Sequence, residues 1–255
     1  MSNQDNNINQ VESINDINDD NKNKISKEEN NINKNNYKVE ILQVPNNYSE
    51  YEIHFKVIVI GNSGVGKTCI TNKAIKNDFN NNYITTIGME IYSLFVKINN
   101  KTIKLQIWDT CGQEIYRSLI VNFYRSTSLA ILVYAINKKD SFRDIDLWIK
   151  ELRSNNSPDT KLILVGNKLD LQDKREISYE EGEKFAQDFG FIDFFETSAK
   201  TGENIQNMFK KAAILLYEEH LKYKEISENT SFNSFKPSMY KTKQIKRTTC
   251  CGYQN

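Results

Sequence analysis

Apolar residues are concentrated in short, nearly continuous runs that polar segments separate. Such runs, rich in Val, Ile and Leu, are typical of strands buried on both faces of a parallel sheet. The expected strands cover residues 53–60, 129–134, 161–165 and 191–196, of which the first three are expected to be buried. Two further segments, 90–98 and 102–108, flank Asn99-Asn100-Lys101 and predict a β-hairpin.

Other segments repeat apolar residues every three or four positions, which is typical of amphipathic helices. Ile145, Trp148 and Leu152 have this spacing, and Asp140-Ser141 before them can cap a helix. The expected helices cover residues 67–77, a segment after 140, 178–189 and 203–222. Strands that alternate with helices predict an α/β doubly wound sheet, and the hairpin makes that sheet mixed.

The composition changes at both ends of the chain. Residues 1–52 are rich in Asn and Asp and hold few aromatic side chains, so they predict a disordered N-terminal extension. Residues 223–255 are hydrophilic and rich in Lys, and they predict a flexible basic tail. The domain expected to fold is therefore 53–222.

Charge and cysteine content narrow the class of protein. The 255-residue chain has a formal net charge of +1, which gives no overall basic field for nucleic acid. No apolar run approaches the roughly 20 residues of a membrane-spanning helix, and the first residues lack a secretory pattern. Cys250 and Cys251 are adjacent, which suits a modification site better than a disulfide framework. We therefore expect an intracellular protein that does not span a membrane.

The segment between the first expected strand and the first expected helix fits the pattern GxxxxGK[ST]. It reads Gly-Asn-Ser-Gly-Val-Gly-Lys-Thr over residues 61–68. The glycines let backbone N–H groups converge on phosphate oxygens, Lys67 supplies a positive charge, and Thr68 supplies a hydroxyl ligand for Mg2+. The pattern predicts a nucleotide phosphate site, and alone it permits ATPases, small-molecule kinases and GTPases.

The motif after the strand at 161–165 indicates the base. It reads Asn167-Lys168-Leu169-Asp170. The carboxylate of Asp170 can accept from the N1–H and the 2-amino group of guanine, two donors that adenine lacks. Ser198-Ala199-Lys200, after the last strand, offers backbone N–H groups to the guanine carbonyl oxygen. These motifs favour GTP and GDP and argue against a small-molecule kinase.

A third motif, residues 109–113, follows the hairpin and carries the chemistry of hydrolysis. Asp109 is placed to bind Mg2+ through water, and Gly112 lets its N–H approach the γ-phosphate. Gln113 can orient the attacking water, which makes it the expected catalytic residue. Thr86, between the phosphate loop and Asp109, can supply a second hydroxyl for Mg2+ when the γ-phosphate is present.

With these motifs in this order, residues 53–222 resemble the Ras superfamily of small GTPases, and most of all the Rab family. The Rab-like stretches are 104–114, 116–119, 148–152, 165–171 and 195–200. The resemblance implies a P-loop GTPase domain with a six-stranded, mostly parallel sheet and helices on both faces. It also implies that Phe79 contacts guanine, although a loop Phe could equally be a satellite core residue. The full set of candidate nucleotide-binding residues is Gly61, Asn62, Ser63, Gly64, Val65, Gly66, Lys67, Thr68, Cys69, Phe79, Tyr83, Thr86, Asp109, Gly112, Asn167, Lys168, Asp170, Ser198, Ala199 and Lys200.

The chain departs from the Rab pattern at a few positions. Cys111 stands where Rab proteins usually carry Ala, and Met89-Glu90-Ile91 stands where they usually show Val-Asp-Phe. Cys111 is slightly larger than Ala and is expected beside the γ-phosphate site, so it could alter hydrolysis or nucleotide release. Nucleotide binding itself is not in doubt.

The tail adds a second implication of the resemblance. Paired terminal cysteines in a Rab-like GTPase imply that Cys250 and Cys251 are both geranylgeranylated, and two lipid chains anchor a protein stably where one does not. Four residues follow Cys251, slightly more than is usual, and Gly252 at the fourth position from the end excludes a CaaX box. Incidental cysteines in a flexible tail remain the alternative.

The sequence therefore predicts a monomeric Rab-like switch of vesicle traffic that binds GTP or GDP with Mg2+ and hydrolyses GTP slowly. The implied partners are an activating protein, an exchange factor, effectors, and the Rab escort and prenyl-transfer machinery, with no nucleic acid. The expected location is the cytoplasmic face of an intracellular membrane, with cycling through the cytosol. The alternative is a GTP-gated scaffold that is not lipidated and hydrolyses very little GTP.

Overall fold

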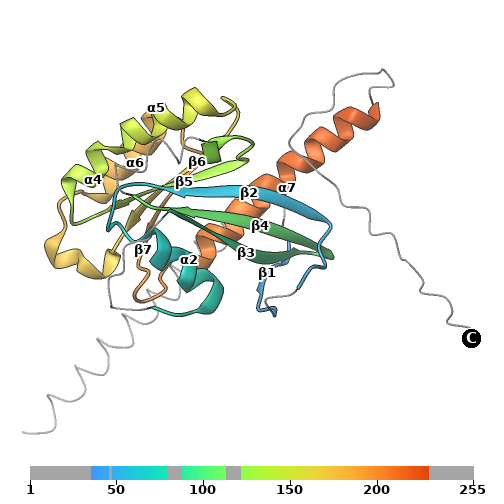
Figure 1. The fold of residues 1–255 in the computed structure, drawn as a ribbon, viewed down its shortest axis with the longest axis horizontal. Helices are drawn as coiled ribbons and strands as arrows, with labels where there is room; N and C mark the ends of the chain where they lie inside the picture. Colours follow the sequence, from blue (N-terminus) through green and yellow to red (C-terminus); the bar gives the residue numbers. More distant parts are fainter. Residues whose placement is uncertain (1–35, 46–47, 80–87, 113–121, 230–255) are drawn as a thin grey trace, which may run out of the picture. The chain divides into compact units, whose positions relative to one another are not determined.

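The computed structural model describes residues 36–45, 48–79, 88–112 and 122–229, and these form a layered α/β structure around one sheet (Figure 1). The strands are β1 (Val39–Leu42), β2 (Ile53–Ile60), β3 (Met89–Ile98), β4 (Lys101–Thr110), β5 (Leu129–Ala135), β6 (Lys161–Asn167) and β7 (Asp193–Thr197). Their order in the sheet is β1-β3-β4-β2-β5-β6-β7. The pairs of β2 with β4 and β5, and of β6 with β5 and β7, are parallel. The α/β fold with a mostly parallel sheet is confirmed.

Helices cover both faces of this sheet, as expected (Figure 1). The helices are α2 (Lys67–Lys76), α4 (Lys139–Arg143), α5 (Ile145–Asn155), α6 (Tyr179–Asp188) and α7 (Ile205–Asn229), with a 3-10 helix at Leu169–Lys174. Helices α4, α5 and α6 lie on one face, and α2 and α7 lie on the other. Every residue of β5 is buried, because this central strand is covered on both sides. The continuous apolar run in its sequence has this cause.

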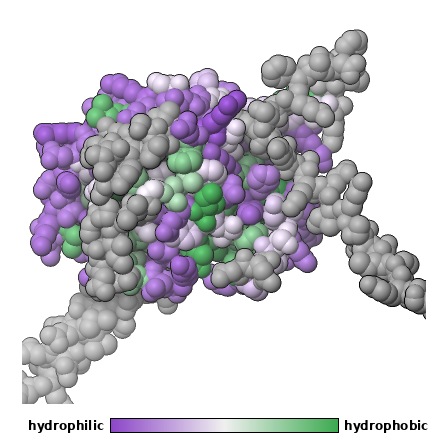
Figure 2. Space-filling model, viewed as in Figure 1, coloured by the Kyte–Doolittle hydropathy of each residue, from purple (hydrophilic) through white to green (hydrophobic). Residues whose placement is uncertain are grey.

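The hydrophobic core on the α5 face joins alternate residues of the strands to the apolar side of the helix. Ile58 and Ile60 of β2 pack in one cluster with Trp148 and Leu152 of α5. The opposite side of α5 holds exposed residues, among them Leu147 and Lys150. The surface visible at the upper left of Figure 2 is mainly hydrophilic. The amphipathic spacing that predicts α5 therefore corresponds to its packing on the sheet.

The sheet has seven strands, one more than the sequence predicts. The additional strand, β1, pairs antiparallel with β3, with Val39 opposite Ile98 and Leu42 opposite Phe95. Beyond β1, the ring of Tyr48 packs edge-on against that of Phe95, with 4.9 Å between centroids. Residues 39–52, assigned from composition to the disordered extension, therefore belong in part to the sheet, whereas residues 1–35 lie outside the described part of the chain. Because edge strands present unpaired backbone groups, β1 shields the end of β3 that it covers.

The hairpin of β3 and β4 is confirmed, but the expected helix cap is wrong. The expected helix after residue 140 is divided into α4 and α5, and α4 begins at Lys139 with no side-chain cap. Ser141 lies inside α4, where its hydroxyl donates to the carbonyl of Lys138 at 2.6 Å and accepts from the N–H of Ala135 at 3.1 Å. Its side chain therefore ties the helix to the end of β5 instead of capping it.

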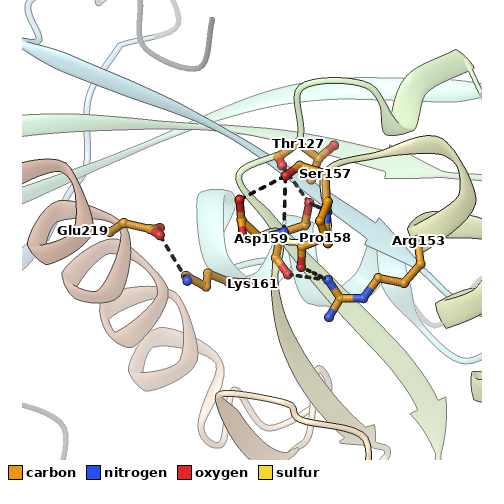
Figure 3. Close-up of polar contacts among 8 residues, drawn as sticks. Thr127, Arg153, Ser157, Pro158, Asp159, Lys161 and Glu219 are labelled. Carbon is orange, nitrogen blue, oxygen red and sulfur yellow. Dashed lines mark hydrogen bonds and ion pairs between the residues drawn. The ribbon is translucent and has the colours of Figure 1, made fainter. Parts of the chain in front are cut away.

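Side chain–backbone hydrogen bonds stabilise the segment between α5 and the amino end of β6 (Figure 3). The guanidinium of Arg153 donates to the carbonyl oxygens of Pro158 and Thr160. Lys161 then pairs with Glu219 of α7 at 3.0 Å, which links β6 to that helix. These contacts support the end of β6 opposite to the one where the motif residues of 167–170 lie.

Helix α7 ends at Asn229, seven residues beyond the expected end at 222. In this added part Ile226 is 60% exposed, so the burial of the apolar side of α7 does not extend here. Within the described ranges no helix combines the length and the apolar character needed to cross a membrane.

Candidate functional site

The candidate site residues follow the carboxyl ends of four strands that are close in the sheet. Residues 61–68 follow β2, 109–112 end and follow β4, 167–170 end and follow β6, and 198–200 follow β7. Parallel strands place their carboxyl ends at one edge, and ligands of doubly wound sheets bind there. The topology therefore gathers the motifs at one edge of the sheet.

The phosphate loop folds around the side chain of its own lysine. Lys67 is 5% exposed, and its ammonium donates to the carbonyl oxygens of Gly61 at 2.8 Å and Asn62 at 2.9 Å. Burial lowers the pKa of Lys67 to about 8, while the nearby charge of Asp109 acts in the opposite direction. Gly66 has a φ of +100°, and a Cβ there would lie 2.3 Å from the amide nitrogen of Asn167. A side chain at Gly66 would therefore disturb both the loop and its contact with the guanine motif.

Asn167 connects the phosphate loop to the two loops expected to hold the base. Its side-chain nitrogen donates to the carbonyl of Val65 at 2.8 Å. Its oxygen accepts from the hydroxyl of Thr197 at 3.2 Å and from the N–H of Ala199 at 3.3 Å. Because Asn167 is 1% exposed, these bonds make it a brace between the three loops.

The carboxylate of Asp170 is exposed and is oriented from one side. The Ser198 hydroxyl donates to Oδ1 of Asp170 at 2.6 Å, and the same hydroxyl oxygen accepts from the N–H of Thr201 at 3.1 Å. Lys168 occupies a left-handed backbone conformation with φ of +72°. This arrangement leaves a carboxylate available beside the 198–200 loop.

An ion pair that the sequence does not predict joins the two loops expected to hold the base. Arg175, just after the 3-10 helix that contains Asp170, pairs with Glu196 at the end of β7, with Nη2 to Oε2 at 2.7 Å. Glu196 is 7% exposed, and the hydrogen bond to it raises the pKa of Arg175. No local pattern signals this contact, because the partners lie 21 residues apart.

Thr68 and Asp109 bring their side-chain oxygen atoms close together. The hydroxyl of Thr68 donates to Oδ2 of Asp109 at 2.6 Å. Oδ1 of Asp109 is buried and has no hydrogen-bond partner among the described residues. Burial raises the pKa of Asp109 to about 6, with the Thr68 bond and the Lys67 charge acting against it. A hydroxyl and an incompletely paired buried carboxylate are hard oxygen donors, which fits Mg2+.

Gly112 lies directly against the phosphate loop. A Cβ on Gly112 would lie 2.4 Å from the carbonyl carbon of Asn62 and 2.4 Å from Nζ of Lys67. Cys111, by contrast, is 1% exposed and packs in the hydrophobic cluster with Ile58 and Tyr124. The extra volume of Cys111 relative to Ala is therefore taken up in the core, while the backbone at Gly112 contacts the site.

Gly112→Ala should lower GTP hydrolysis by roughly a hundredfold, because the segment that leads into Gln113 must move away from the phosphate loop. The measurement is single-turnover hydrolysis of GTP by the loaded protein. Gly190→Ala is the control, because it strains the backbone at a φ of +70° while its Cβ would meet nothing within 4 Å. Equal hydrolysis by Gly112→Ala and wild type would contradict the close approach.

Phe79 is half-buried beyond the end of α2, and its contact with guanine stays a prediction. Several candidate residues lie outside the described part of the chain. These are Tyr83, Thr86, Gln113, Cys250 and Cys251.

The family model described as the Ras family matches residues 56–218. The Ras-related protein Rab-8A of Gallus gallus is 44% identical over 159 residues, which are 62% of this chain and 76% of that protein. Rab-8A of Bos taurus is 43% identical over the same shares of both chains.

Proposed function

The chain belongs to the Ras family and is a Rab-like small GTPase that hydrolyses GTP, and on this basis we propose that it is a GTP/GDP switch of vesicle and membrane traffic. The observation that supports the switch best is the brace formed by Asn167, which joins the phosphate loop to the loops of Asp170 and Ser198. The site can thus contact the phosphates and the base of one nucleotide at the same time.

The test of this function is the nucleotide that the protein holds and prefers. Purified protein should release GDP or GTP on denaturation, as identified by chromatography. GTP should displace a fluorescent GDP analogue at far lower concentration than ATP, because adenine leaves the Asp170 carboxylate without its donors. Equal competition by ATP would refute the guanine assignment.

Ras-family GTPases generally use Mg2+, and the oxygen atoms of this site suit it. We propose that Thr68 ligates the ion directly, that Asp109 holds it through water, and that Thr86 joins when GTP is bound. When bound, Mg2+ would supply positive charge that offsets the negative charge of the phosphates. Lys67 adds a second positive charge from within the loop, and Gly112 directs its N–H toward the γ-phosphate.

The same proposal extends to the partners. Gln113 orients the attacking water, and an activating protein that supplies an arginine to the transferred phosphate gives fast turnover. An exchange factor, effectors, and the escort and prenyl-transfer machinery complete the expected set of partners. The switch cycles between the cytosol and the cytoplasmic face of an intracellular membrane.

Replacing both Cys250 and Cys251 with Ser should move the protein from membranes to the soluble fraction while GTP binding is unchanged. The reason is that two geranylgeranyl chains are needed for stable anchoring. The measurements are cell fractionation and mass spectrometry of the C-terminal peptide. Changing the adjacent Thr248 and Thr249 to Ala is the control in the same tail. Unmodified cysteines on membrane-free native protein would favour the unlipidated scaffold.

A further inference from the structure

The side chain of Asn62, the second residue of the phosphate loop, is bound by two residues far away in the sequence. Its Nδ2 donates to Oδ2 of Asp144 at 2.5 Å, and its Oδ1 accepts from the indole N–H of Trp148 at 2.8 Å. Asp144 lies between α4 and α5, and Trp148 is in the first turns of α5. Asn62 is 7% exposed and Trp148 is fully buried. The contact therefore connects the phosphate loop to the junction of two helices.

The chemistry of the two partners permits only one orientation of the Asn62 amide. An indole nitrogen can only donate, and an ionised carboxylate can only accept. The amide must therefore present its oxygen to Trp148 and its nitrogen to Asp144. A side chain with a single hydrogen-bonding character at position 62 would leave one of the partners unsatisfied.

The backbone of Asn62 lies at the centre of the site. Its carbonyl accepts from the ammonium of Lys67 at 2.9 Å, and a Cβ on Gly112 would come within 2.5 Å of that same oxygen. The position of this carbonyl thus determines where the Lys67 charge lies and how closely Gly112 approaches. A restraint on the Asn62 side chain therefore also restrains the residue whose carbonyl contacts these two groups.

We propose that Asp144 and Trp148 are positioning residues of the nucleotide site, which act through Asn62 to hold the phosphate loop in its binding conformation. The inference rests on the proposed role of this loop in binding GTP and GDP. Because Asn62 belongs to the phosphate loop, loss of its two partners should act on the phosphates and on nucleotide release, and should leave the preference for guanine intact.

The test is an exchange of the two polar partners. Asn62→Asp places two carboxylates side by side and should speed GDP release by at least about tenfold, because the loop loses its restraint. The double variant Asn62→Asp/Asp144→Asn restores a donor opposite an acceptor, and the new carboxylate at position 62 can still accept from Trp148. Its GDP release should return to within about threefold of wild type, which is the signature of direct coupling. Release is followed with a fluorescent GDP analogue at fixed Mg2+ concentration.

Two further variants keep the test decisive. Asp144→Ala removes a half-buried partner, so it should fold even where Asn62→Asp does not, and it should also speed release severalfold. Asp146→Ala is the matched control on α5, because Asp146 pairs with Lys150 on the surface at 2.5 Å, and GDP release should stay unchanged. Urea unfolding of each variant separates lost stability from lost positioning.

The outcomes are distinct. Equal release rates for Asn62→Asp and the double variant, or wild-type release from Asp144→Ala, would overturn the positioning role. A lower unfolding midpoint with unchanged release would show that the contact serves only the fold. If wild type itself failed to hold guanine nucleotide, the proposed function would fail whatever the variants did.

Discussion

Asp170→Asn should lower the affinity for GTP by about a thousandfold or more and make xanthosine triphosphate the preferred nucleotide. A site built to accept hydrogen bonds from a base rejects the analogue that cannot donate them by about 10^4-fold. Ser198 donates to Oδ1 of Asp170 at 2.6 Å, and an Asn oxygen can accept the same bond. The Asn nitrogen then faces the base, where it repels the guanine amino group and matches the 2-oxo group of xanthine.

The measurement is competition of both triphosphates against a fluorescent GDP analogue. Asp173→Asn is a suitable control, because Asp173 is an exposed carboxylate in the same 3-10 helix, and its loss should leave the preference for GTP unchanged. Retention of GTP preference by Asp170→Asn would show that another group reads the base.

Gln113→Leu should abolish most of the acceleration that an activating protein provides, which is about 10^3–10^5-fold for related phosphoryl transfers. Leu cannot orient water, and the proposed roles give Gln113 no contact with the phosphates or with Mg2+. The variant should therefore remain loaded with GTP, with nearly unchanged nucleotide affinity. The measurement is GTP hydrolysis by loaded protein, with and without cell extract as a source of activating protein.

Thr68→Asn provides the contrast to Gln113→Leu. The Thr68 hydroxyl donates a hydrogen bond to Asp109 at 2.6 Å. Thr68 is proposed to ligate Mg2+ in both nucleotide states, so its loss should weaken GTP binding and favour GDP-bound or empty protein.

If Gln113→Leu hydrolysed GTP as fast as wild type in the presence of an activating protein, Gln113 would have no catalytic role.

Much of the fold could be predicted because its signals are local. A fully buried strand such as β5 must be apolar at every position, and a helix such as α5 must repeat its apolar residues on the side that meets the sheet. Strand β1 lacks such a signal, since Val39–Leu42 is short and lies in an Asn-rich segment. Its stability comes from β3, which no local pattern reveals.

Part of the candidate site could likewise be predicted from the sequence, and part could not. The motif residues could be named from the sequence because phosphate and guanine chemistry demand particular residue types at fixed spacing. Asp144 and Trp148 could not, because they meet Asn62 across 82 and 86 residues of chain. Motifs thus predict the groups that face the ligand, and only the fold reveals distant residues that contact them, as Asp144 and Trp148 contact Asn62.

The position of β1 in the sheet has a consequence for the order of events on the ribosome. Val39 is made before its partner Ile98, and from position 39 to position 98 the separation is 59 residues. At about 5–20 residues per second, β1 waits roughly 3–12 s for a strand to pair with. The β3–β4 hairpin needs no such wait, since Ile98 pairs with Lys101 across a two-residue turn. Among the described strands, the first to be synthesised can therefore join the sheet only after the hairpin strand beside it exists.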